Sequence, residues 1–237
     1  MLPAFHLATV QHDELPTRSK CYWLLPRIFT WGTLALLVLL LLQSIGGFTL
    51  YQPSLFGYHI IGMSTFVLIG NQESILLYTD PLLCCSRYNS KSSTTLCSLL
   101  LYMFSLICVF GGAISMFYYK NQIVPYHFYS THSWLGIACI LSWFIQVIIN
   151  AFCVTSWKNV YSYIIKTTYI LGLTSCALGL QEIQTFTNMS NYVIGYNDTS
   201  VVPVMNTSWW SLQANIGVLL LACTGIITLY TTSTAPQ

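Results

Sequence analysis

Apolar residues in this chain are gathered into six long runs that alternate with short polar stretches. Each run has about 19 to 25 residues, and at about 1.5 Å per residue a helix of that length crosses the ~30 Å of hydrocarbon in a bilayer. The pattern therefore predicts an all-α polytopic membrane protein with six transmembrane helices in one bundle. The six runs are Ile28–Leu50, Leu55–Tyr78, Thr95–Tyr119, Ser130–Cys153, Tyr161–Glu182 and Leu212–Tyr230.

Composition supports a membrane location. Only 6% of the residues are charged, 55% are hydrophobic, and the mean hydropathy is +0.64. An ordinary soluble domain has about 25% charged residues, so lipid is favoured over water as the solvent. The net charge of +2 is too small to indicate a nucleic-acid partner. The first run exceeds the ~7–15 residues of a signal-peptide core, and no A-x-A-like site follows it, so we expect a retained signal-anchor helix.

Lysine and arginine are distributed unevenly, and this predicts the orientation. Seven of the eight basic residues lie on the side of the membrane where the chain begins: Arg18, Lys20, Arg27, Arg87, Lys91, Lys158 and Lys166. The positive-inside rule then places the segment 1–27 and the tail 231–237 in the cytosol, on either side of a transmembrane domain that covers residues 28–230. Glu73, inside the second run near its cytosolic end, is expected to cap the helix or to reach interfacial water.

Three glycosylation sequons support the same orientation. They begin at Asn188, Asn197 and Asn206, and all three fall in the predicted non-cytosolic loop Ile183–Ser211. Modification of these asparagines would make the chain a glycoprotein of the secretory and endomembrane route, in the plasma membrane, a vesicle or the lysosome. The alternative is that they are unmodified polar residues of a loop.

Two histidines lie in matching positions of the second and fourth runs. His59 and His132 are each within about four residues of the non-cytosolic start of their run, so the two imidazoles are expected at nearly the same depth. Two neutral imidazoles that face each other in a bundle can bind a haem iron axially. The alternative is a pair of hydrogen-bonded histidines that serve helix packing. Gly57, Gly62 and Gly136 nearby would either admit a flat macrocycle or let the helices approach closely.

Several segments resemble the cytochrome b561 family. The stretch from Phe128 to Ile137, with its histidine-serine-tryptophan sequence, closely resembles the family signature, and the stretch from Phe56 to Met63 resembles the segment around the family's first histidine. Weaker matches are the residues from Glu73 to Tyr78, Gln146, the residues from Gly179 to Glu182, and those from Asn215 to Gly217. The resemblance covers about residues 28–230.

This resemblance implies a six-helix protein that transfers single electrons across a membrane through two haem b groups, each bound by two histidines. It implies ascorbate as the cytosolic donor and monodehydroascorbate or a ferric chelate as the acceptor outside. His59 and His132 match the ligands of the non-cytosolic haem, and Tyr126, His127 and Phe128 match the region that shapes the external substrate site. The alternative for those three is an ordinary exposed aromatic loop. A homodimer is also implied by the family likeness.

The chain departs from the family pattern at the cytosolic haem. The family has one histidine early in each of the third and fifth helices, but here those positions hold Ser93, Thr94 or Cys97, and Tyr161, Ser162 or Tyr163. Thr79 stands where the family has a basic residue. We therefore expect one haem b, at the non-cytosolic side, in a membrane electron-transfer protein; whether it is an enzyme is left open. The alternatives are a non-catalytic relative and, from sequence class alone, a small carrier or channel, which the lack of Gly/Pro-broken helix pairs disfavours.

Overall fold

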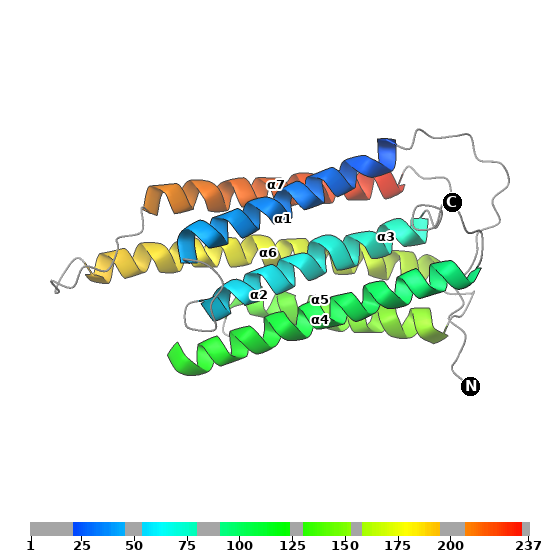
Figure 1. Ribbon diagram of the computed structural model, residues 1–237, viewed down its shortest axis with the longest axis horizontal. Coiled ribbons are helices and arrows are strands. Elements are labelled where there is room, and N and C mark those ends of the chain that lie inside the picture. Colours follow the sequence, from blue (N-terminus) through cyan, green and yellow to red (C-terminus); the bar gives the residue numbers. More distant parts are fainter. Residues whose placement is uncertain are drawn as a thin grey trace.

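The computed structural model describes the backbone of residues 21–45, 54–79, 91–123, 130–152, 158–194 and 207–233. Within these ranges all the regular structure is helical. The helices are α1 (Cys21–Ile45), α2 (Ser54–Thr65), the π-helix η1 (Phe66–Asn71), α3 (Gln72–Thr79), α4 (Lys91–Ile123), α5 (Thr131–Phe152), α6 (Lys158–Ile194) and α7 (Thr207–Ser233). Because α2, η1 and α3 follow one another without a break, they form a single long helix (Figure 1).

The helices run alternately up and down and form one elongated bundle (Figure 1). Helix α5 packs against α6, α2 against α4, and α7 against both α1 and α6. We call the end where α1 begins and α7 finishes the terminal end, and the opposite end the far end. Five described helical segments are long and apolar enough to cross a membrane, and the side chains described on α1, Leu24–Leu39, form a shorter apolar stretch. The expected all-α polytopic membrane fold is confirmed.

Several helices extend beyond the apolar runs that predict them, and α1 and α6 differ from the prediction most clearly. Helix α1 begins at Cys21 rather than Ile28, so Pro26 lies inside it. Helix α6 continues to Ile194, through residues that we expected to begin a loop at Ile183. The reason is that neither glycine nor proline occurs between Ile183 and Ile194, so nothing in this polar stretch interrupts the helix before Gly195.

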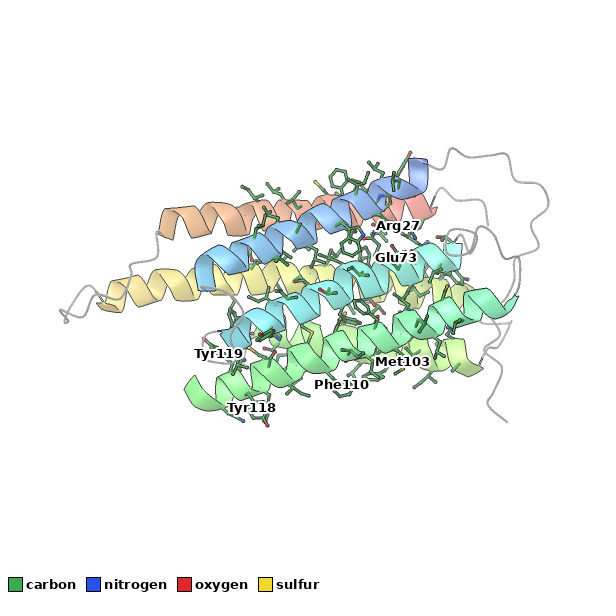
Figure 2. The ribbon with its side chains drawn as sticks, in the orientation of Figure 1. Arg27, Glu73, Met103, Phe110, Tyr118 and Tyr119 are labelled. Carbon is green, nitrogen blue, oxygen red and sulfur yellow. The ribbon has the colours of Figure 1, made fainter. Side chains whose placement is uncertain are left out.

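Large apolar side chains cover much of the outer surface of the bundle. Helix α4 exposes Met103, Phe110 and Tyr118, which point away from the other helices (Figure 2). In water such a surface would drive aggregation, but lipid tails are as apolar as these side chains. The bundle core contains large aromatic side chains, among which Trp143 and Tyr169 are almost completely buried. The outer surface of α4 is therefore the lipid-facing side of a membrane helix.

The π-helix η1 interrupts the long second helix at its middle. A π-helix adds one residue to a helical turn, and such turns are rare outside functional or strained positions. Here the change of register leaves two consecutive amide side chains buried, Asn71 and Gln72. The amide oxygen of Gln72 accepts hydrogen bonds from the hydroxyls of Thr30 and Tyr169. This contact ties α3 to both α1 and α6.

An ion pair links α1 to α3 near the terminal end. Arg27 donates two hydrogen bonds to the carboxylate of Glu73, from Nε at 2.7 Å and from one terminal nitrogen at 2.5 Å (Figure 2). The two side chains are 24% and 23% exposed. Glu73 was expected to cap a helix or to reach interfacial water. In the structure its carboxylate is instead paired with Arg27, which lies on the neighbouring helix α1. A two-point contact of this kind is stronger than a simple charge pair.

We expect Glu73→Gln to lower the free energy of unfolding in detergent by about 1–3 kcal/mol, because it leaves the guanidinium of Arg27 without its counter-charge. Solvent screening keeps the loss below the ~3–5 kcal/mol of fully buried pairs. Thermal unfolding monitored by circular dichroism measures the change. Glu182→Gln is the matched control, since no ion pair of Glu182 is found within the described part of the chain.

The double variant Arg27→Leu with Glu73→Leu should lose less stability than the sum of the two single variants, since it removes both charges together. Strict additivity of the single variants would show that the two side chains do not stabilise each other.

Candidate functional site

The imidazoles of His59, on α2, and His132, on α5, face each other at the far end of the bundle. Their ring centres are 6.1 Å apart, and the ring planes are nearly perpendicular, at 88°. The expected match in depth is therefore present between two helices that lie far apart in the sequence. Phe56 lies beside this pair, with its ring centre 6.5 Å from that of His59.

Each imidazole is held by a backbone carbonyl of a neighbouring helix. Nδ1 of His59 is 2.9 Å from the carbonyl oxygen of Gly112, on α4, and Nδ1 of His132 is 2.8 Å from that of Ser175, on α6. A carbonyl oxygen can only accept, so each Nδ1 carries the proton and donates it. The lone pair of each neutral ring then lies on Nε2, which is the nitrogen that can bind a metal. Partners of this kind are what fix the tautomer and the ring orientation of metal-binding histidines.

The hydroxyl of Ser175 adds a second contact to His132. It lies 3.2 Å from Nδ1 of the ring and donates to the backbone carbonyl oxygen of His132, also at 3.2 Å. On the other side of the site, the carbonyl oxygen of Gly112 also accepts a hydrogen bond from the hydroxyl of Ser115, at 2.9 Å. Each imidazole and the carbonyl that holds it thus belong to a small group of polar contacts, some between helices and some within one helix, in an otherwise apolar region.

Glycines let the helices approach closely enough for these contacts. A Cβ atom at Gly62 would lie 2.9 Å from the carbonyl oxygen of Cys108 and 3.0 Å from Cα of Gly112. A Cβ atom at Gly136 would lie 3.3 Å from the hydroxyl oxygen of Ser175. Of the two roles considered for these glycines, the contacts support close helix packing.

Gly179, on α6, is the glycine that touches a histidine ring. A Cβ atom there would lie 2.9 Å from Cε1 and 3.1 Å from Nδ1 of His132. The missing side chain therefore makes room for the imidazole itself. Gly179 lies within one of the segments that resemble the family, but its contact with His132 carries no sequence signal and is revealed only by the packing of α6 on α5.

The separation of the two rings fits one metal ion between them. An imidazole nitrogen binds a transition metal at about 2.0–2.1 Å, so two imidazoles that shared one metal ion would have ring centres about 6 Å apart. The 6.1 Å between His59 and His132 meets this requirement. Among the residues whose side chains are described, no group of three or more His, Cys, Asp or Glu could hold a metal ion. The arrangement therefore suits a group that needs two protein ligands and brings its own remaining ones, as haem does.

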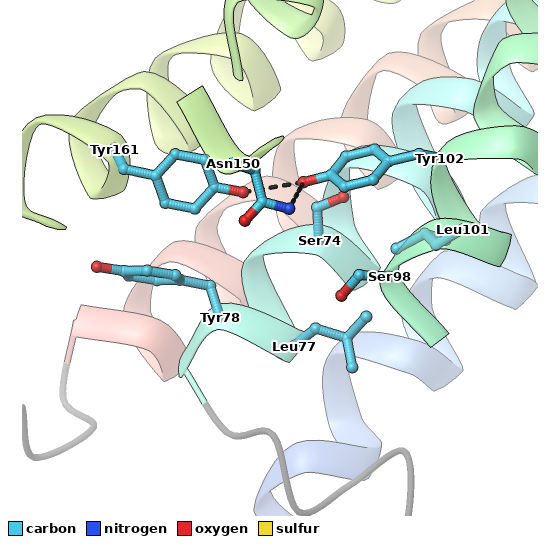
Figure 3. A pocket seen from close by; sticks show the side chains of 8 residues that line it. All are labelled: Ser74, Leu77, Tyr78, Ser98, Leu101, Tyr102, Asn150 and Tyr161. Atoms are coloured by element: carbon cyan, nitrogen blue, oxygen red, sulfur yellow. Dashed lines mark hydrogen bonds between the residues drawn. The ribbon is translucent and has the colours of Figure 1, made fainter. Parts of the chain in front are cut away.

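The terminal end of the bundle has a different chemistry. A small pocket there is lined by Ser74, Leu77, Tyr78, Ser98, Leu101, Tyr102, Asn150 and Tyr161 (Figure 3). The hydroxyls of Tyr102, on α4, and Tyr161, on α6, are hydrogen-bonded at 2.9 Å, and the side-chain nitrogen of Asn150 donates to Tyr102 at 3.2 Å. Neither α4 nor α6 contains a histidine. Two phenols thus meet between the two helices that each carry a histidine in the family pattern, and of the positions named for those histidines only Tyr161 takes part in the pair.

Several predicted residues cannot be placed. Tyr126, His127, Phe128, Asn197 and Asn206 lie outside the described residues, and Asn188 lies on α6 with its side chain outside them. Sequence reasoning missed Tyr102 and Asn150. The spacing of the inner face of α5 could have indicated Asn150, because His132, Cys139, Trp143, Gln146 and Asn150 follow one another at intervals of seven, four, three and four residues.

Comparison with known proteins adds an independent result. A family model described as eukaryotic cytochrome b561 matches residues 58–187. The mouse protein named transmembrane ascorbate-dependent reductase CYB561 is 24% identical over 195 residues, which cover 78% of this chain and 71% of the relative. The human protein of the same name is 26% identical over 154 residues, which cover 61% of this chain and 57% of the relative. The Pongo abelii protein is 24% identical over 195 residues, with the same coverage as the mouse protein. Because the family model matches more than half of the chain and includes both histidines, this protein belongs to the cytochrome b561 family.

Proposed function

We propose that this protein is a membrane electron-transfer protein that binds one haem b between His59 and His132. The observation that carries the proposal is the pair of imidazoles 6.1 Å apart, each with Nδ1 donating to a backbone carbonyl. That arrangement leaves the Nε2 lone pair of each ring for metal binding and holds both rings in place. A haem bound there supplies one-electron redox chemistry. Helices α2, α4, α5 and α6 supply the two histidines and the carbonyls that hold them.

A single haem is supported by the residues at the terminal end. A second haem held in the same way would need a histidine on each of two facing helices. The facing side chains of α4 and α6 are instead Tyr102 and Tyr161, whose hydroxyls bond to each other. Tyr78 packs on Tyr161 with ring centres 5.2 Å apart, so aromatic side chains occupy this part of the core. We therefore infer that the second haem site of the family is lost.

The proposed orientation places the histidine pair near the non-cytosolic side, because the order of the apolar runs assigns seven of the eight basic residues to the side of the membrane where the chain begins. The relatives are named for ascorbate-dependent reduction. We propose ascorbate or a ferric chelate as the small molecule that exchanges electrons with this protein, at a non-cytosolic site that includes Tyr126, His127 and Phe128. If it is an enzyme, it is a reductase of this class. Glycosylation at Asn188, Asn197 and Asn206, an endomembrane location and a homodimer belong to the same proposal.

A non-catalytic relative is the second candidate, and one observation favours it. The hydrogen bonds of His59 and His132 tie α2 to α4 and α5 to α6, so both side chains would stabilise the bundle without a metal. In that case the same four-helix contact would serve as a structural core for a membrane interaction protein. The presence or absence of haem in folded protein separates the two candidates.

We expect purified protein, reduced with dithionite, to show a b-type haem spectrum, and the pyridine haemochrome assay to give about one haem per chain. His59→Ala and His132→Ala should each weaken haem binding by more than about 100-fold, since the loss of a ligand must exceed the 10–100-fold cost of losing a partner of that ligand. His12→Ala is the control and should keep the spectrum. Two haems per chain would contradict the single-site assignment, and folded but colourless protein would favour the non-catalytic candidate.

Gly179→Ala should weaken haem binding by about 5- to 150-fold, because overpacking against His132 costs about 1–3 kcal/mol. The added methyl group would lie 2.9 Å from the ring, so the imidazole must shift. Haem titration of the apoprotein measures the affinity. Gly111→Ala is the matched control, because a Cβ atom there meets nothing within 4 Å. Equal affinities of the two variants would show that the ring position is not set by Gly179.

In oriented proteoliposomes, ascorbate on the non-cytosolic side should reduce the haem much faster than ascorbate on the cytosolic side. A single haem near one side leaves most of the ~30 Å of hydrocarbon between it and the other side, and electron tunnelling weakens steeply with distance. Stopped-flow absorbance measures both rates. Equal rates from the two sides would contradict the single-haem assignment.

A further inference from the structure

Lys120 is a basic residue near the far end of the bundle. Of the eight lysines and arginines in the chain, the order of the apolar runs assigns only this one to the non-cytosolic side of the membrane. It lies on α4, one residue before the end of the membrane-spanning segment Leu96–Asn121. The end of the bundle that holds the histidine pair thus also carries this positive charge.

The position of Lys120 along α4 places it on the inward face of that helix. It follows Val109 by eleven residues and Tyr102 by eighteen, which are close to three and five full turns, so all three share one face. Val109 and Tyr102 are buried, and Tyr102 packs against Trp143 on α5 with ring centres 6.4 Å apart. Tyr118 is more than half exposed and points away from the bundle (Figure 2). The partly buried side chain of Lys120 therefore lies on the side of α4 that faces the interior.

Neighbouring contacts on α4 give the depth of Lys120 relative to the histidine pair. The ring of Tyr119 packs against that of Phe56, which lies beside His59 (Figure 2). Gly112, whose carbonyl holds His59, precedes Lys120 by eight residues, or about 12 Å along the helix axis. Helical side chains lean toward the N-terminus of their helix, so the long side chain of Lys120 leads back toward the histidines. Its charge lies within electrostatic range of the His59 ring.

A haem bound by the two imidazoles brings negative charges of its own. Haem b has two propionate groups on one edge of the macrocycle, and at neutral pH both are carboxylates. A carboxylate inside a membrane is costly unless water or a cation pairs with it. The imidazoles and the carbonyls that hold them are neutral. Lys120 is a positive charge at the same end that can offset one of the two carboxylates.

We propose that Lys120 forms an ion pair with one propionate of the haem b that His59 and His132 bind. The inference rests on the function proposed above. A lysine near the end of a membrane helix can instead extend to the lipid headgroups, but the inward face that Lys120 occupies favours the haem edge. The ion pair holds the macrocycle in one orientation about the axis between the imidazoles. It also favours the reduced haem, because a nearby positive charge stabilises the state that has gained an electron.

Removing the charge from the lysine and from the propionates in turn tests the pair, with the full-length protein reconstituted in nanodiscs. We expect Lys120→Met, which keeps the side chain long but uncharged, to weaken haem b binding by about 5- to 30-fold, since a charge-assisted hydrogen bond is lost. Haem b dimethyl ester, which has no carboxylates, should bind equally well to the wild-type protein and to Lys120→Met. Lys120→Arg should keep most of the affinity for haem b. Lys166→Met is the matched control on α6, and it should bind haem b like the wild-type protein.

The reduction potential of the haem is a second readout, which a purely structural role of Lys120 would not move. Lys120→Met should lower the midpoint potential, and Lys120→Arg should keep it. Unchanged affinity and potential in Lys120→Met would overturn this inference and leave the proposed function standing, even if reduction by external ascorbate became slower. Equal losses of affinity for haem b and for its dimethyl ester would overturn it too, since Lys120 would then act through helix packing. Folded wild-type protein that binds no haem would overturn the proposed function together with this inference.

Discussion

Two backbone carbonyls determine the arrangement at the far end of this bundle. Those of Gly112 and Ser175 each accept the Nδ1 proton of a histidine from another helix. A neutral imidazole inside a membrane needs such a partner, because the surrounding hydrocarbon offers none. The same two bonds join α2 to α4 and α5 to α6, so the contacts that stabilise the bundle also orient the rings. Packing and chemistry therefore cannot be separated at this site.

The two ends of the bundle solve the problem of buried polar groups differently. At the far end, two imidazoles each bond to a main-chain oxygen and keep one nitrogen with a lone pair. At the terminal end, the hydroxyls of Tyr102 and Tyr161 bond to each other, and Asn150 completes the group. A phenol can donate and accept at once, so a pair of phenols is satisfied without a metal. This contrast within one core is the physical basis for proposing one haem rather than two.

The sequence predicted the parts of the structure that depend on a local pattern. The apolar runs gave the helices, and the positions of His59 and His132 near the starts of their runs predicted their meeting across the core. The partners of those histidines could not be predicted, because a carbonyl of Gly112 or Ser175 carries no sequence signal. The contact of Gly179 with His132 likewise depends on how α6 lies on α5. The ion pair of Arg27 with Glu73 was missed because the two residues lie on separate helices whose rotation only the fold determines.

The π-helix η1 divides the second membrane helix into two halves, and the half after it is rotated about the helix axis relative to the half before it. The half before it packs mainly against α4, and the half after it contacts α6 and α7 as well as α4. An uninterrupted α-helix advances by about 100° per residue, so the single extra residue turns everything beyond Asn71 by roughly that angle relative to His59. Substitutions that adapt one half to its neighbours therefore need not disturb the other. A chain built this way can alter the end that holds tyrosines while its histidine end keeps its original alignment.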